Sequence, residues 1–325
     1  MIKVENIDYR LSLYYSYLLP LFKIKSINSK LVFIKRQGSC KGLKCIQENN
    51  IIECNIPDQC EPNEYKKILG LNTRQIFDEL MNKLNISLEN MFRRITLIYS
   101  DNISDKKIIF LTIFLSRNTD YYKNTVRWIN YILENNCIKN PYKCIPLIRS
   151  YQYKQFTEIS NDLLEVFRSS SRKYDVFDEI LSLLRIRHIG LKSINAYLLH
   201  VYGNTYYAPI DRHYKLALRK IGLKGIIPSK KYCLLSRLHC ETCSMRSRCL
   251  YYISRELLGK YNGVFQSISY IHGRISSICN GATKIEDLEH HILGDLRKLC
   301  KAIDNDYKEI ICKIKAEFAE FNKLS

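Results

Sequence analysis

No apolar run in this chain approaches the ~20 residues that a membrane-spanning helix requires. The longest, Ile108–Leu115, has eight residues, and one of them is threonine. The N-terminal stretch MIKVENIDYR is not followed by the apolar core of a secretion signal. We therefore expect no membrane partner and an intracellular location, which in a prokaryote means the cytoplasm or nucleoid.

Acidic residues are too few to balance the basic ones. The chain has 32 Asp and Glu against 51 Lys and Arg, a formal net charge of +19. A surplus of this size predicts a polyanionic partner, either nucleic acid or an anionic membrane surface. Without a spanning segment or a signal, nucleic acid is favoured. The alternative is a soluble protein that is merely basic.

The thirteen cysteines cannot all be paired, because their number is odd. One set lies between Cys40 and Cys60, with four, eight and five residues between its members, which matches no ligand pattern. For Cys40, Cys45, Cys54 and Cys60 we expect buried thiols or one or two disulfides, with a second metal site as the alternative. The scattered cysteines are interpreted as small buried hydrophobic residues: Cys137, Cys144, Cys279, Cys300 and Cys312.

The hydrophobic pattern changes along the chain. KLVFIKRQG and NNIIECNI, both before residue 65, are bounded by Gly, Asn and Pro, as strands are. From about residue 66, apolar residues recur at helical spacing, and there is no internal repeat. The pattern predicts a mainly α protein with a small N-terminal β-rich domain over residues 1–65.

Residues 186–213, IRHIGLKSINAYLLHVYGNTYYAPIDRH, predict two helices joined by a short turn. Free amides and the positive dipole end at the start of the second helix bind phosphate. Gly190 permits close approach of the backbone to a DNA strand. On shape alone, many helical hairpins have this pattern.

Two residues make the hairpin more informative. Lys192 lies in the first turn of the second helix, where the dipole disfavours an ammonium and a neutral amine is a nucleophile. Asp211 comes nineteen residues later, at the expected start of another helix. The ordinary interpretations are a solvated surface lysine and a helix cap.

The stretch resembles the helix–hairpin–helix (HhH-GPD) DNA glycosylase superfamily, which includes endonuclease III and 8-oxoguanine glycosylase. The resemblance rests on GLK at 190–192 and PIDRH at 209–213 and covers about residues 66–250. It implies a two-lobed helical fold, with Lys192 as the nucleophile and Asp211 as the catalytic carboxylate. It also implies that His213 contacts the DNA backbone.

The earlier segment FLTIFLSRNTDYYKNTVRWI looks like the first barrel helix of this family and its intercalation loop. That likeness implies Asn118 as the wedge inserted into DNA, with Arg117 and Thr119 beside it. The family's hairpin usually begins Pro-Gly, whereas this chain has Arg187 and His188 there. We expect Arg187 to replace the turn preference with a phosphate contact.

The segment CLLSRLHCETCSMRSRC has the spacing Cys–x6–Cys–x2–Cys–x5–Cys. Four thiolates on one tight loop suit a cubane cluster. Zinc is the alternative, although a typical zinc site brings two Cys pairs together and only one Cys-x-x-Cys is present here; disulfides are a third interpretation. The spacing resembles the 4Fe-4S loop of endonuclease III and the adenine glycosylases. The resemblance implies these cluster ligands: Cys233, Cys240, Cys243 and Cys249.

The expected organisation has four parts: the β-rich domain 1–65, a helical glycosylase core 66–232, the cluster loop 233–249 and C-terminal helices 250–325 that complete the second lobe. The resemblance implies a monomeric, bifunctional DNA glycosylase and AP lyase of base excision repair, acting on damaged double-stranded DNA.

The damaged base is left open by the sequence. The N-terminal β-rich piece favours 8-oxoguanine, whereas the LSRNT segment and the cluster loop favour an endonuclease III-type enzyme for oxidised pyrimidines. An adenine-type monofunctional glycosylase is disfavoured, because that group lacks the lysine. A non-catalytic hairpin module that only binds DNA is a further alternative, although simple binding needs neither Lys192 nor Asp211.

Overall fold

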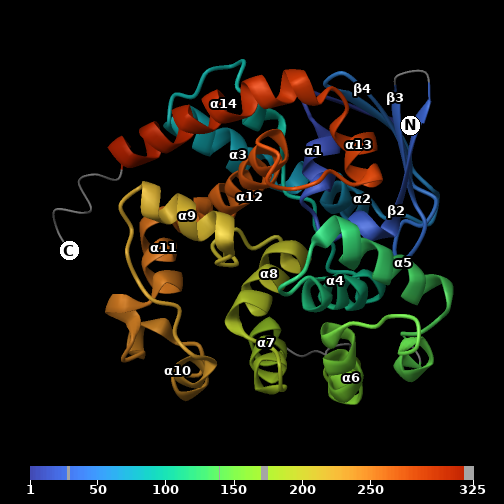
Figure 1. Ribbon diagram of the computed structural model, residues 1–325, viewed down its shortest axis with the longest axis vertical. Helices are drawn as coiled ribbons and strands as arrows, with labels where there is room; N and C mark the ends of the chain where they lie inside the picture. Colours follow the sequence, from blue (N-terminus) through green and yellow to red (C-terminus); the bar gives the residue numbers. More distant parts are fainter. Residues whose placement is uncertain (28–29, 139, 170–174, 318–325) are drawn as a thin grey trace.

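The first 55 residues build one antiparallel sheet, in the strand order β1-β5-β4-β3-β2. The computed structural model describes residues 1–27, 30–138, 140–169 and 175–317, and Figure 1 shows the sheet at one side of the molecule. Alternate residues of β4 and β5 are buried, so one face of the sheet packs on the core. The strands are β1 (Ile2–Glu5), β2 (Phe22–Ile27), β3 (Lys30–Lys35), β4 (Lys44–Glu48) and β5 (Ile51–Asn55).

Helices form most of the rest of the described chain, so the expectation of a mainly α protein with a small N-terminal sheet is confirmed. None of the described helices is long and apolar enough to cross a bilayer. Their bounds are α1 (Tyr9–Tyr14), α2 (Pro62–Ile68), α3 (Leu71–Lys83), α4 (Ile103–Leu115), α5 (Val126–Glu134), α6 (Tyr151–Ser169), α7 (Val176–Arg185), α8 (Leu191–Tyr202), α9 (Arg212–Lys220), α10 (Lys230–Leu235), α11 (Leu250–Leu258), α12 (Asn262–Cys279), α13 (Asp287–Leu293) and α14 (Leu296–Glu317).

Helix α8 lies in the interior of the molecule. Every residue from Ser193 to Val201 is buried, as expected of a helix that packs on all sides. The helix ends where Gly203 adopts the left-handed conformation, at φ 65°. A Cβ at this position would lie within 3 Å of the Tyr99 ring, so close packing also requires the glycine. This burial fixes the direction in which the first turn of α8 points.

The two ends of the described chain pack against each other. Arg10 donates a hydrogen bond to the Leu293 carbonyl at 3.0 Å, and the Tyr14 hydroxyl donates to Glu289 at 2.7 Å. Helix α13 therefore covers α1, as Figure 1 also shows. These hydrogen bonds join residues before position 65 to residues after position 250. The four-part division of the chain therefore stays a prediction.

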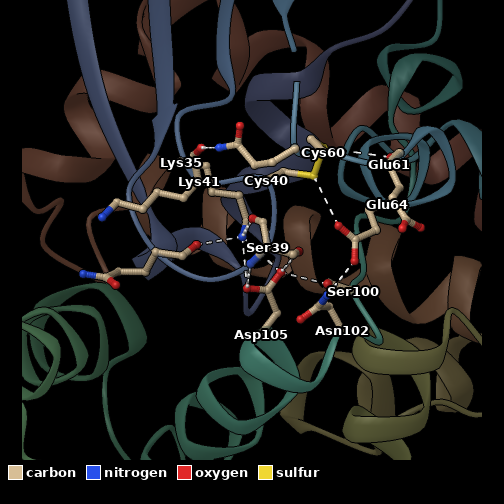
Figure 2. The surroundings of a disulfide bond; sticks show 12 residues. Lys35, Ser39, Cys40, Lys41, Cys60, Glu61, Glu64, Ser100, Asn102 and Asp105 are labelled. Atoms are coloured by element: carbon tan, nitrogen blue, oxygen red, sulfur yellow. Dashed lines mark hydrogen bonds and ion pairs between the residues drawn. A yellow bond between two sulfur atoms is a disulfide. The ribbon is translucent and has the colours of Figure 1, made fainter. Parts of the chain in front are cut away.

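A buried ion pair joins the sheet to helix α4 (Figure 2). Lys35 Nζ lies 3.0 Å from Asp105 Oδ1, and neither side chain is exposed. Asp105 also accepts hydrogen bonds from the Ser39 amide and hydroxyl and from the Ser100 hydroxyl. Gly38 is needed here, because its φ is +75° and a Cβ would lie 1.6 Å from Asp105 Oδ1.

Eight cysteines form four disulfides. The N-terminal set forms Cys40–Cys60, beside Glu64 in Figure 2, and Cys45–Cys54, which joins residues that face each other on β4 and β5. For this N-terminal set, the expectation of one or two disulfides is therefore confirmed.

The interpretation of the scattered cysteines as small buried hydrophobic residues holds for the burial of Cys137 and Cys144 but fails for Cys312. The structure pairs Cys137 with Cys144 and Cys279 with Cys300, and Cys312 is exposed. These pairings depend on how the helices meet. The second disulfide, for example, joins α12 to α14, which are neighbours only in the folded chain.

Candidate functional site

The predicted hairpin is present. Helix α7 ends at Arg185, and Gly190 is the N-cap of α8, with an extended backbone. A Cβ on Gly190 would meet no protein atom within 4 Å, so nothing in the fold requires a glycine there. The position is open to an approaching ligand. The Arg187 side chain beside it is 79% exposed and 3.9 Å from Glu158.

The turn is held in shape from two sides. His188 has a positive φ of 65°, and its ring contacts Gln155 and Glu158 at 3.0 Å each. On the other side, Lys230 donates hydrogen bonds to the carbonyls of Leu184, Ile186 and Ile189. Side chains from α6 and α10 thus hold the turn at the place where this chain has Arg187 and His188.

Lys192 and Asp211 line one cavity of about 500 Å³. Lys192 is exposed in the first turn of α8. Asp211 is the N-cap of α9: its Oδ1 accepts from the Tyr214 amide at 2.8 Å, and its Oδ2 accepts from Gln266 Nε2 at 2.8 Å. Asp211 therefore does cap α9, but only one of its carboxylate oxygens takes part in the cap. Gln266 on α12 orients the other.

His213 lines the same cavity. It packs edge-on against Tyr270 and so close to Gly273 that a Cβ there would lie 2.0 Å from its Nδ1. Burial lowers the pKa of His213; Asp211 opposes this shift, while the nearby Lys192 adds to it. Lys192, Asp211 and His213, which the sequence singled out, therefore lie close enough for their charges to interact.

Aromatic rings form a wall of this cavity. Tyr17, from the segment after α1, contacts Tyr121 and His200 edge-on, with ring centroids 5.7 and 4.9 Å apart. The tyrosines are hydrogen-bonded: Tyr121 donates to a backbone carbonyl, and the Tyr17 hydroxyl lies 3.5 Å from that of Ser116. The N-terminal part of the chain therefore completes the pocket.

Two polar groups in the pocket lack partners. His200 Nδ1 and Gln266 Oε1 are both buried and make no hydrogen bond in the described part of the chain. Unsatisfied buried polar groups are costly and mark sites that a ligand or water completes. Burial lowers the pKa of His200 to about 3, so the ring is neutral. Neither residue was found from the sequence, because no local pattern marks them.

The loop after α4 borders the cavity. Asn118 is exposed, has a left-handed backbone (φ 52°) and, like Thr119, lines the cavity. Arg117 instead turns inward: its guanidinium lies 3.7 Å from the Phe114 ring centroid and bonds Gln155. Arg117 thus connects this loop to the hairpin. The wedge role of Asn118 and the DNA contacts of its neighbours stay predictions.

The four cysteines of the 233–249 segment line a second, enclosed cavity. Burial, and then the three neighbouring thiols, raise the pKa of Cys233 to about 12. Between the first two cysteines, Arg237 and Leu238 both have positive φ values. Two successive left-handed residues cost energy, so the surroundings of the loop must stabilise this shape.

The spacing of the sulfurs bears on which metal fits. Within the described residues, no three of these four sulfurs lie within 4.8 Å of one another. One zinc ion with bonds of about 2.3 Å would hold all four sulfurs about 3.8 Å apart. A cubane needs a wider cage, since each thiolate binds a different iron. The four sulfurs are therefore not at the spacing that a single zinc ion requires.

No family model matches the chain, and no curated protein matches it by sequence. Solved structures with a similar fold include the 8-oxoguanine glycosylase/lyase of Clostridium acetobutylicum with double-stranded DNA that contains cytosine opposite 8-oxoguanine. That structure has 13% identity and a TM-score of 0.57, over 83% of this chain and 93% of that one. Its apo form has 14% identity and a TM-score of 0.56, over 82% of this chain and 93% of that one. MBOgg1 in complex with a low-affinity DNA ligand has 10% identity and a TM-score of 0.52, over 83% of this chain and 93% of that one. At sequence identities this low, the comparison shows a shared fold and nothing more.

Proposed function

We propose that this chain is a bifunctional DNA glycosylase and AP lyase that removes an oxidised base from double-stranded DNA. The observation that carries the proposal is that Lys192, at the start of α8, and Asp211 line the same cavity. The Asp211 oxygen that does not cap α9 accepts a hydrogen bond from Gln266. A module that only binds DNA needs neither residue. The fold shared with 8-oxoguanine glycosylase/lyases supports the proposal.

The reaction begins when the damaged nucleotide is rotated out of the duplex into the cavity. The amine of Lys192 attacks C1′ of the deoxyribose, and the N-glycosidic bond breaks with its electron pair leaving on the base. Asp211 stabilises the positive charge that develops on the sugar. Loss of a proton from the amine and opening of the sugar ring give a Schiff base, from which β-elimination breaks the 3′ C–O bond.

We favour 8-oxoguanine as the base, because the N-terminal sheet part accompanies the helical core and supplies Tyr15 and Tyr17 to the pocket. Oxidised pyrimidines are the alternative substrate. The unpaired atoms of His200 and Gln266 supply polar contacts for the edge of an extruded base.

We also propose that Cys233, Cys240, Cys243 and Cys249 hold a 4Fe-4S cluster. Such a cluster would fix the shape of the loop and take no part in the bond-breaking steps. The basic residues of this loop, including Arg246 and Arg248, would then be held in place to contact phosphates.

Borohydride trapping tests the proposal. Wild-type protein and Lys192→Gln are incubated with a duplex that contains an abasic site, and with duplexes that contain 8-oxoguanine or an oxidised pyrimidine. We expect a covalent adduct with wild type and with Lys224→Gln, an exposed lysine outside the cavity, and none with Lys192→Gln. No wild-type adduct would indicate a binding module. An adduct with Lys192→Gln would place the nucleophile elsewhere.

A further inference from the structure

Three backbone oxygens of the hairpin converge on one ammonium group. Lys230 Nζ donates to the carbonyls of Leu184 at 3.2 Å, Ile186 at 2.9 Å and Ile189 at 3.3 Å. A lysine ammonium has three donors, so all of them are used within the protein. Burial lowers the pKa of Lys230.

These contacts fix the direction of the amides that face outward. A peptide unit is planar and trans, so a carbonyl that points inward turns the next N–H the opposite way. The Ile189 carbonyl points to Lys230, and the Gly190 amide of the same peptide has no acceptor in the described part of the chain. Gly190 is also open, since no atom lies within 4 Å of its Cβ position.

We propose that Lys230 is the positioning residue of this hairpin: its ammonium serves as an internal cation that draws the turn carbonyls together and aims the Gly190 amide at a DNA phosphate. The inference rests on the proposed action on DNA. It names the group that prepares the phosphate site before DNA arrives.

The position of Lys230 links this role to the cysteine loop. Lys230 is the first residue of α10, the helix that carries Cys233. The loop and the hairpin are therefore coupled through one side chain. The next residue, Lys231, is exposed and makes no hydrogen bond to the hairpin among the described residues, so it provides a control with the same charge.

The test replaces the ammonium and then supplies a free cation. Lys230→Met and Lys231→Met are compared with wild type for binding to a duplex with a stable abasic-site analogue, by fluorescence anisotropy. Binding is measured at equal ionic strength in potassium chloride and in tetramethylammonium chloride. Potassium binds cages of backbone carbonyls, whereas tetramethylammonium is too large and has no donor.

We expect Lys230→Met to bind the duplex roughly tenfold or more weakly in tetramethylammonium, because a charge-assisted contact set is lost. Potassium should restore most of this affinity. Wild type and Lys231→Met should bind alike in both salts, and Lys230→Arg should resemble wild type. Equal affinities of Lys230→Met and Lys231→Met in tetramethylammonium would overturn the proposal.

Amide hydrogen exchange gives a second readout that needs no DNA. Lys230→Met should exchange faster at residues 186–192 without a general loss of protection; if it does not fold, Lys230→Gln takes its place. Weak binding in both salts with unchanged exchange there would also overturn the proposal. If wild type neither binds the duplex nor forms a borohydride adduct, the proposed function fails, and hydrogen exchange still decides the role of Lys230.

Discussion

Lys35 and Asp105 form an ion pair that is completely removed from solvent and joins strand β3 to helix α4, with Nζ 3.0 Å from both carboxylate oxygens. Removing one partner leaves an uncompensated buried charge. Lys35→Met should therefore lower the free energy of unfolding by about 3–5 kcal/mol. Urea denaturation measures this. The control is Lys30→Met on the same strand, which loses an exposed pair with Glu48 and should unfold almost like wild type.

Asp211→Asn separates the structural role of the carboxylate from its charge. Asparagine caps helices as well as aspartate does, so the Tyr214 amide keeps its acceptor. Gln266 can rotate its amide, because its Oε1 makes no hydrogen bond within the described ranges of the chain. We expect a stability change within about 1 kcal/mol and near-normal DNA affinity, but base release slower by orders of magnitude in single-turnover assays. Base release at the wild-type rate would remove Asp211 from the chemistry.

Acid should destabilise the fold through His200. Its pKa is about 3 in the folded protein, below the ordinary 6.5, so the unfolded chain takes up the proton first as the pH falls. The contribution of the neutral His200 ring to the free energy of unfolding is fully present above pH 6.5. It is lost progressively as the pH falls from 6.5 to 3. Between pH 7 and 4.5, wild type should lose about 2–3 kcal/mol more than His200→Phe. Urea denaturation at both pH values measures the difference, and parallel losses in the two proteins would contradict it.

The same residue provides a test of base recognition. His200→Phe keeps an aromatic ring beside Tyr15 and Tyr17 but removes both nitrogens. We expect trapping on abasic DNA to persist, because no base is present to be contacted. Excision of the damaged base should fall at least about tenfold, the cost of one lost polar contact. Equal loss on both substrates would indicate a purely structural role.

The proposed cluster predicts a colour and an iron content. Purified protein should be yellow-brown, and Cys243→Ser should lose the visible absorption and unfold more easily, because only Cys233 and Cys249 of the 233–249 loop are buried. Cys312→Ser is the matched control, since Cys312 is also a free cysteine but is exposed on α14. Metal analysis that finds zinc and no iron would refute the cluster.

Binding to undamaged duplex should depend steeply on salt, because phosphate contacts release counterions. Arg187→Gln should weaken binding to all sequences and reduce the log–log salt slope by about 1. Arg297→Gln, exposed at the start of α14, should leave the slope unchanged. A wild-type slope near zero would contradict the electrostatic interpretation.

The sequence predicted the features that local patterns encode. Lys192 and Asp211 each lie at a helix start, where the neighbouring residues reveal their position, and the structure places both in one cavity. The sheet strands were visible from their composition and their bounding residues. By contrast, no pattern indicated α1, whose importance comes from the residues directly after it. Tyr15 and Tyr17 reach a pocket whose other walls are about a hundred residues or more away.

The rest depended on tertiary contacts. His200 and Gln266 are functional candidates only because α8 and α12 bring them to the same cavity with atoms left unpaired. The Cys279–Cys300 disulfide likewise requires α12 to meet α14. Lys230 and Lys231 are adjacent in sequence and equal in charge. Only in the folded protein does Lys230 differ, because it then has three carbonyl partners. No single-sequence pattern distinguishes such residues.

The contact between the two ends of the chain has a consequence for biosynthesis. The pocket uses Tyr17 near the start of the chain and Arg274 near its end, and Arg274 in turn is held by Glu289 at 2.7 Å. A ribosome must therefore release the chain at least as far as Glu289 before this pocket can be complete. A shorter nascent chain would already carry the hairpin, but its pocket would lack the wall that Arg274 forms.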